Sequence, residues 1–299
     1  MTSSRQISRR GVLGLTAGGV LTLASGGVAT ATPARSAGST GDELDRLESG
    51  FRTRLGVYAI NTRTGSTLTH RADERFPIAS VFKTLAAAAI LRDHDRHGEL
   101  LRSRRYWTAD EVVEASPVTS THVADGMTVA ELCEAAITRS DNTAGNQLLK
   151  IIGGPRGVTR FARSIGDRET RLDRWETELN AAIPGDVRDT TTPSAIAHSY
   201  AGLVLGHALT GRDRRQLRYW LLHNQTSAQR FGAGVPDGWP LADKTGAPNY
   251  GGINDVGITW TPDNSPIVLA ALSVTDRPDA VADPRLMEDV ARLCCARLR

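Results

Sequence analysis

A serine and a lysine three residues apart are the first candidates for chemistry in this 299-residue chain. Ser80 and Lys83 stand at the start of an alanine-rich stretch that predicts a helix, in which residues i and i+3 share a face. The amine can therefore reach the hydroxyl, and a serine hydroxyl becomes a nucleophile when a neighbouring base takes its proton. Backbone N–H groups at a helix amino terminus can also stabilise a developing oxyanion.

The scarcity of lysine supports this interpretation, because Ser-x-x-Lys alone is a weak signal. Of the 36 lysines and arginines in the chain, only Lys83, Lys150 and Lys244 are lysines. An arginine cannot lose its proton in a protein, whereas a lysine can. A site that needs a deprotonatable amine would have to keep lysine.

Three other polar segments could take part in the same chemistry. Ser140–Asn142 connects two predicted helices, which by itself is typical of a helix cap. Asp243–Gly246 precedes a break between predicted strands, and its lysine and threonine offer a cation and a hydroxyl to a carboxylate. In the segment from Arg174 to Asn180, a helical turn would place Glu176 and Asn180 on one face and direct Glu178 elsewhere.

In this order and at these spacings, Ser-x-x-Lys, Ser-Asp-Asn and Lys-Thr-Gly resemble the signature of the serine penicillin-recognising enzymes. Residues 174–180 resemble the loop that separates class A serine β-lactamases from their peptidase relatives. The resemblance covers roughly residues 42–298 and includes the segments Ser116–Thr119, Asp125–Ile137, Arg188–Pro193 and Val235–Trp239. It implies a monomeric hydrolase that opens the lactam ring of penicillins and cephalosporins, needs no cofactor or metal, and confers resistance to these compounds.

The resemblance also implies a role for each catalytic candidate. Ser80 would attack the lactam carbonyl, and either Lys83 or Glu176 with a water would take its proton. Ser140 would pass a proton to the leaving nitrogen. Glu176 and Asn180 would hold the water that hydrolyses the acyl-enzyme.

The remaining roles concern binding and support. The resemblance implies that backbone N–H groups of Ser80 and Ala247 form the oxyanion hole and that Asn142 binds the acylamino side chain of the substrate. The residues expected to bind the substrate carboxylate are Lys244, Thr245, Gly246 and Arg230. Arg230 lies six residues before Pro236, where one branch of the family places its second cation, and other members use the strand position occupied here by Ile253. Arg174 and Asp189 would form the ion pair that closes the loop at its neck.

Three positions depart from the family pattern. Ala115 stands where most members carry an aromatic residue at the entrance, which predicts a wider site. Ala79 and Pro248 occupy the positions of the paired cysteines of the carbapenem-hydrolysing subgroup, so strong carbapenem hydrolysis is not expected.

Two other activities remain as alternatives. A D-Ala-D-Ala carboxypeptidase shares the three short motifs but should lack the loop that carries Glu176. A β-lactam sensor or binding module would be acylated without turnover and would be expected to have a membrane segment. A third hypothesis is a catalytically inactive homologue, although every polar residue that the mechanism requires is present.

The elements that must position these residues predict a two-lobe α/β fold. Residues 42–70 and 222–299 form the predicted α/β domain, an antiparallel sheet flanked by helices that both chain ends contribute. This domain includes a hairpin after residue 54, two strands between residues 251 and 275, and a helix near residues 284–298. Residues 71–221 have helical periodicity and predict an inserted all-helical domain.

The amino terminus predicts export. Arg9 and Arg10 precede a glycine-rich apolar run, so residues 1–31 resemble a twin-arginine signal peptide, and residues 32–41 read as a flexible leader. Residues 1–31 hold three arginines and no acid, so the 36 bases and 33 acids of the chain become 33 and 33 after cleavage. The charge therefore indicates neither a nucleic-acid partner nor stable membrane association, and the mature protein is expected outside the cell.

Cysteine and histidine give no further site. Cys133, Cys294 and Cys295 are too few for a disulfide framework, and each is expected to be a free thiol. His94 and His97 lie among charged residues, which is typical of a solvated helix face rather than of a metal site.

Overall fold

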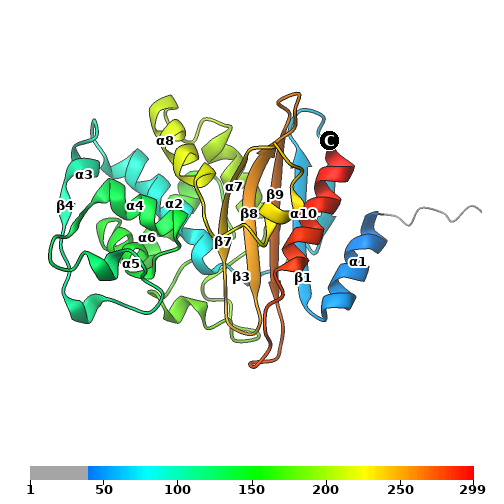
Figure 1. Cartoon of the computed structure of the whole chain (residues 1–299), viewed down its shortest axis with the longest axis horizontal. Helices are drawn as coiled ribbons and strands as arrows, with labels where there is room; N and C mark the ends of the chain where they lie inside the picture. Colours follow the sequence, from blue (N-terminus) through cyan, green and yellow to red (C-terminus); the bar gives the residue numbers. More distant parts are fainter. Residues whose placement is uncertain (1–39) are drawn as a thin grey trace, which may run out of the picture. The chain divides into compact units, whose positions relative to one another are not determined.

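The structure is a computed structural model that describes residues 40–299 of the chain (Figure 1). The predicted signal peptide, and the predicted leader as far as residue 39, lie outside the described residues. Within residues 40–299, none of the helices has the length and apolar character needed to cross a membrane.

A five-stranded antiparallel sheet, in the order β2-β1-β9-β8-β7, forms the centre of the fold. Its strands are β1 (Arg54–Asn61), β2 (Thr67–His70), β7 (Leu241–Gly246), β8 (Ile253–Trp260) and β9 (Pro266–Val274). The predicted hairpin forms β1 and β2, and β1 then pairs with β9 from the other end of the chain. The expectation that both chain ends build the sheet is therefore confirmed.

The edge strand β7 is the element that apolar alternation does not reveal. Asp243, Lys244 and Thr245 are three consecutive polar residues, yet all three are buried in this strand. Their burial follows from position, because β7 contacts β8, helix α8 (Gly211–Leu222) and the turn Ala79–Val81.

Helices surround the sheet on both faces (Figure 1). They are α1 (Thr40–Phe51), α2 (Phe82–Ala89), α3 (Glu99–Arg102), α4 (Val129–Thr138), α5 (Asn142–Ile151), α6 (Pro155–Ser164), α7 (Pro193–Val204), α8 (Gly211–Leu222), α9 (Phe231–Gly234) and α10 (Arg285–Leu298). In Figure 1, α2 to α6 gather on one side of the sheet, and α1 and α10 lie on the opposite side. Two further antiparallel strand pairs lie outside the main sheet. They are β3 (Phe76–Pro77) with β6 (Thr190–Thr191), and β4 (Arg104–Arg105) with β5 (Met127–Thr128).

Two hydrophobic clusters lie on the two faces of the sheet. Val256 and Val268 face the helical side, and their cluster continues into α2 and α4. Leu269 faces the other side and packs with Val290 of α10. Helix α7 also contacts β1, β8 and β9, although it lies within residues 71–221. The domain boundaries at residues 71 and 221 stay a prediction.

Two glycine-to-alanine substitutions test the packing of the α9–α10 contact. A Cβ at Gly234 would lie 2.0 Å from the carbonyl oxygen of Glu288, a backbone atom that cannot move aside. We expect Gly234→Ala to lower the free energy of unfolding by about 1–3 kcal/mol. A Cβ at the helical Gly50 meets nothing within 4 Å, so Gly50→Ala should raise it by about 0.5–1 kcal/mol. Urea unfolding measures both, and equal effects of the two substitutions would contradict the packing argument.

Candidate active site

Ser80 lies in a short 3₁₀ turn, Ala79–Val81, that leads directly into α2. The residue is 8% exposed, and the preceding Ala79 has a φ of +45°, in the left-handed region that alanine rarely adopts. The turn therefore presents the serine hydroxyl at the amino end of α2, as the sequence predicted.

Lys83 is fully buried and is surrounded by oxygen atoms. Its Nζ lies 2.9 Å from Ser80 Oγ and 3.0 Å from Glu176 Oε1. It also donates to Asn142 Oδ1 at 2.7 Å and to the backbone oxygen of Ser140 at 2.8 Å. Burial lowers the pKa of the Lys83 amine, and the Glu176 carboxylate partly opposes this shift. An amine whose proton is held less tightly is suited to exchange it with the adjacent hydroxyl.

Glu176 and Asn180 share one face of the loop, in agreement with the predicted spacing. Ser80 Oγ donates to Glu176 Oε1 at 3.4 Å, and Asn180 Nδ2 donates to Glu176 Oε2 at 2.7 Å. The Glu176–Thr177 peptide bond is cis. Glu178 is exposed, in agreement with the expectation that it lies outside this group. The carboxylate of Glu176 is thus held between the nucleophile and an amide.

Asn146 of α5 was not among the sequence candidates, although it holds Glu176 in place. Its Oδ1 accepts from the Glu176 backbone N–H at 2.9 Å, and its Nδ2 donates to the Glu176 carbonyl at 3.0 Å. Asn142 and Asn146 are four residues apart on α5, and this i, i+4 spacing is the signal that could have indicated a shared face.

The two ends of the loop that carries Glu176 are held together by one buried carboxylate. Asp189 is fully buried and accepts from Arg174 Nε at 2.5 Å. It also accepts from the backbone N–H groups of Asp173 and Arg174, at 2.7 and 2.9 Å. The predicted pair is therefore in contact, and these bonds join the two ends of the loop that carries Glu176.

Ser140 lies between the two buried lysines. It has a φ of +56°, and its Oγ accepts from Lys244 Nζ at 3.0 Å while its backbone oxygen accepts from Lys83. Burial lowers the pKa of Lys244 well below its usual value, and the positive charge of Lys83 adds to this shift. The Ser140 hydroxyl thus borders the Lys244 amine on the sheet side, and the backbone oxygen of Ser140 borders the Lys83 amine on the helix side.

Asp141 anchors the connection that carries Ser140, whereas the sequence predicts it only as part of a helix cap. Its buried carboxylate accepts from the N–H groups of Val118 and Thr119, the hydroxyl of Thr119 and the N–H of Ala144. It caps α5 as expected, and it also ties the 116–121 segment to the Ser140 connection.

Asn142 links the site to the entrance. Its N–H donates to the backbone oxygen of Ala115 at 3.1 Å, and its Nδ2 donates to the backbone oxygen of Glu114 at 2.9 Å. Because an amide NH₂ has two hydrogens, one remains for a ligand. Ala115 itself is exposed, so no aromatic side chain covers this part of the entrance.

Arg230 lies against the end of β7. Its Nη1 donates to the backbone oxygens of Gly246 at 2.8 Å and Asn254 at 3.0 Å. The hydroxyl of Thr245 lies 2.5 Å from that of Thr226. Lys244, Thr245, Gly246 and Arg230 are therefore close together in space, and Ala247 follows directly as an exposed residue.

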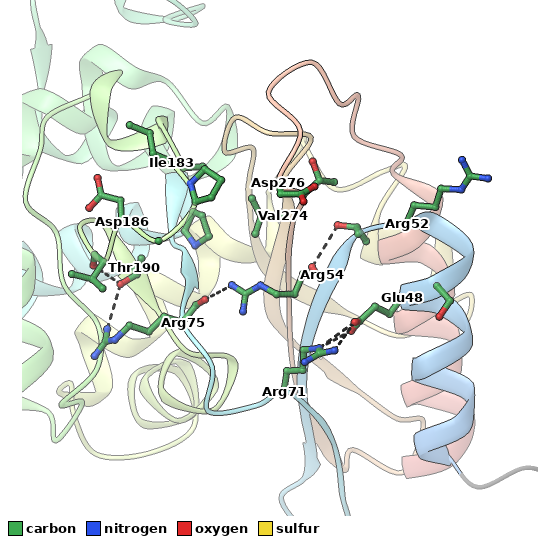
Figure 2. Close-up of a pocket in the computed structure, with 18 residues that line it drawn as sticks. Glu48, Arg52, Arg54, Arg71, Arg75, Ile183, Asp186, Thr190, Val274 and Asp276 are labelled. Carbon is green, nitrogen blue, oxygen red and sulfur yellow. Dashed lines mark hydrogen bonds and ion pairs between the residues drawn. The ribbon is translucent and has the colours of Figure 1, made fainter.

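A cavity of about 680 Å³ lies elsewhere, beside residues 182–187 (Figure 2). Figure 2 shows Arg54, Arg71 and Arg75 around it, but none of the candidate catalytic residues lines it. These arginines form ion pairs with Glu74, Glu48 and Glu169. The cavity is thus separate from the site around Ser80.

The geometry around Ser80 defines a class of enzyme. A serine hydroxyl at a helix amino terminus, in contact with a buried amine and a carboxylate, can form a serine ester and then lose it to water. These are the requirements of a serine hydrolase that works through an acyl-enzyme.

Comparisons with known proteins identify the family. A model described as "Beta-lactamase enzyme family" matches residues 40–298, and the chain belongs to this family. It is 51% identical to a β-lactamase of Streptomyces lavendulae over 99% of both chains. It is 55% identical to a β-lactamase of Streptomyces fradiae, over 88% of this chain and 87% of that one.

Solved structures agree with this assignment. The structure of a β-lactamase from Streptomyces albus G has a TM-score of 0.86 and 53% identity, and the match covers 88% of this chain and 100% of that one. An ancestral class A β-lactamase has a TM-score of 0.83 and 48% identity over 87% of this chain and 100% of its own. The class A resemblance and the predicted fold class are both confirmed.

The pKa of Lys83 provides a test of the site's electrostatics. The Glu176 carboxylate favours the protonated amine, so Glu176→Gln should lower the pKa of Lys83 further. Nuclear magnetic resonance of protein labelled with carbon-13 lysine can follow the three lysine signals, with Lys150→Arg as an aid to assignment. Glu178→Gln, which removes an exposed neighbouring charge, should leave the Lys83 pKa unchanged. An unchanged or raised pKa in Glu176→Gln would refute this account.

Proposed function

We propose that this protein hydrolyses the lactam ring of penicillins and cephalosporins through an acyl-enzyme on Ser80 and thereby confers resistance to them. The observation that carries the proposal is the contact of Ser80 Oγ with both Lys83 Nζ, at 2.9 Å, and Glu176 Oε1, at 3.4 Å. The names of the related proteins support the same activity.

In the acylation step, Ser80 attacks the lactam carbonyl carbon and forms an ester as the ring C–N bond breaks. The serine proton passes to Lys83 or, through a water, to Glu176, and both acceptors are supported by their position beside the hydroxyl. Ser140 supplies the proton to the leaving nitrogen, and its contacts to both buried lysines support this role. The N–H groups of Ser80 and Ala247 stabilise the oxyanion, for which each donor contributes about 10²–10³ in rate.

In the deacylation step, Glu176 takes a proton from a water that attacks the ester. The amide of Asn180 holds the second carboxylate oxygen and helps to position this water. General-base assistance is worth about 10²–10⁴ in rate, which separates an enzyme that turns over from one that stays acylated. The presence of Glu176 on this loop favours the hydrolase over the carboxypeptidase and sensor alternatives.

Substrate binding uses the two sides of the entrance. Asn142 binds the acylamino side chain with its remaining amide hydrogen, and Lys244, Thr245, Gly246 and Arg230 bind the carboxylate. The proximity of Arg230 to Gly246 supports its part in this group. The protein acts as a monomer outside the cell after twin-arginine export.

Replacement of Glu176 tests the deacylation step. With a chromogenic cephalosporin, Glu176→Ala should lower kcat by at least about 10²-fold, because the water loses its base. Intact mass spectrometry should then show an adduct on the variant that does not accumulate on the wild-type protein. The matched control is Glu178→Ala, which should turn over normally. A persistent stoichiometric adduct on the wild-type protein would instead favour a sensor or a peptidase.

Replacement of Arg230 tests the carboxylate site. Arg230→Ala should raise KM for benzylpenicillin by about 10-fold or more, because a charge-assisted hydrogen bond is lost. Arg277→Ala removes an exposed arginine that is not among the residues expected to bind the carboxylate, and it serves as the control. An unchanged KM in Arg230→Ala would remove Arg230 from the carboxylate site.

A further inference from the structure

Two aspartates share a buried site behind the β7 edge. Asp243 is 2% exposed and Asp255 is fully buried. The register pairs Asp243 with Gly257 and Thr245 with Asp255, so the two aspartates are diagonal neighbours on one face of the sheet. Each of the two carboxyl groups influences the pKa of the other, so their side chains lie near each other. A carboxylate can only accept, so a hydrogen bond between the two would require that one of them carries a proton.

The hydrogen bonds of the pair leave one oxygen of each aspartate free. Asp243 Oδ1 accepts from Asn224 Nδ2 at 3.0 Å, and Asp255 Oδ2 accepts from the N–H of Phe231 at 3.2 Å. Asp243 Oδ2 and Asp255 Oδ1 are buried and have no hydrogen-bond partner within the described part of the chain, so these are the two atoms that a shared proton would join. Burial raises the pKa of both groups, and the charge of Asp243 raises that of Asp255 further.

The pair joins two parts of the carboxylate site. On one side, Asn224 Oδ1 accepts from Thr226 Oγ1 at 2.8 Å, and Thr226 Oγ1 lies 2.5 Å from Thr245 Oγ1. On the other side, Asp255 holds the backbone N–H of Phe231, the residue that directly follows Arg230. With a proton shared between the two aspartates, a continuous series of hydrogen bonds would run from Thr245 to the backbone beside Arg230.

We propose that Asp243 and Asp255 form a positioning pair that holds one proton and sets Thr245 and Arg230 relative to each other for the substrate carboxylate. This inference rests on the proposed function. Two ionised carboxylates would repel each other in this buried place. Two neutral acids would remove the negative charge that favours the half-buried guanidinium of Arg230. A pair with one proton and one negative charge avoids the repulsion between two carboxylates and keeps a negative charge near Arg230.

Two substitutions of Asp255 separate the shared proton from simple packing. In Asp255→Asn, the amide oxygen can accept from Phe231 and the NH₂ group can donate to Asp243, so KM and kcat for benzylpenicillin should stay within about 2-fold of wild type. Asp255→Ala removes both contacts and should raise KM by about 10-fold while kcat changes by less than about 3-fold. An increase in KM with Asp255→Asn as large as with Asp255→Ala would overturn the proposal.

A substrate whose own carboxylate is esterified, and which therefore lacks that negative charge, serves as the control for binding of the substrate carboxylate. For the methyl ester of a chromogenic cephalosporin, Asp255→Ala should leave KM unchanged relative to wild type. The double variant D243N/D255N, which lacks both the proton and the negative charge, should raise KM for benzylpenicillin as Asp255→Ala does. Equal increases in KM for the acid and the ester would indicate a general structural defect and overturn the positioning role.

Infrared spectroscopy tests the proton without any turnover. At neutral pH, the difference spectrum between wild type and Asp255→Asn should contain the C=O stretch of a protonated carboxylic acid that only the wild type has. Absence of this band would overturn the proposal, even if Asp255→Ala fails to fold. If the wild-type protein does not hydrolyse β-lactams, the proposed function fails, and the band still shows whether the pair holds a proton.

Discussion

The burial of the Lys83 amine is the constraint on which the rest of the site depends. A buried ammonium costs several kcal/mol unless it is paired, and here the oxygen atoms around it come from separate parts of the chain. Asn142 belongs to α5, Ser140 to the connection before it, and Glu176 to the loop. Gly145 completes this environment, because a Cβ there would lie 2.8 Å from Lys83 Cε. The helices and the loop must therefore be assembled before the lysine can be buried.

Ser140 connects this constraint to the sheet. Its backbone oxygen binds Lys83 and its hydroxyl binds Lys244, so one residue with a positive φ joins the helical side to β7. The two lysines are both buried and repel each other, which makes the placement of the surrounding negative charge important. Glu176 lies beside one lysine, and the carboxylate of Asp243 belongs to the strand that carries the other.

The sequence predicted those parts of the site that depend on local spacing. Ser80 and Lys83 lie within one turn of each other, and Glu176 and Asn180 lie four residues apart, so secondary structure alone brings each pair together. The pattern of predicted strands and helices supplied the fold class, and family resemblance supplied the contact of Arg174 with Asp189. Asn146, Asp141 and the two aspartates of the sheet were not predicted as site residues, because their partners lie far away in the sequence. The apolar alternation of the sequence does not indicate strand β7, because three of its buried residues, Asp243, Lys244 and Thr245, are polar.

The pairing of β1 with β9 has a consequence for the order of assembly. Arg54 at the start of β1 pairs with Val274 at the end of β9, and within residues 40–299 β1 lies between β2 and β9 in the sheet. Synthesis proceeds from the amino terminus, so the ladder of β1 cannot be completed until β9 has been synthesised. Such distant contacts slow folding, because the entropy cost of closing the long loop is incurred before the strand pairing contributes stability. The nascent chain therefore exposes one unpaired edge of β1 until β9 leaves the ribosome.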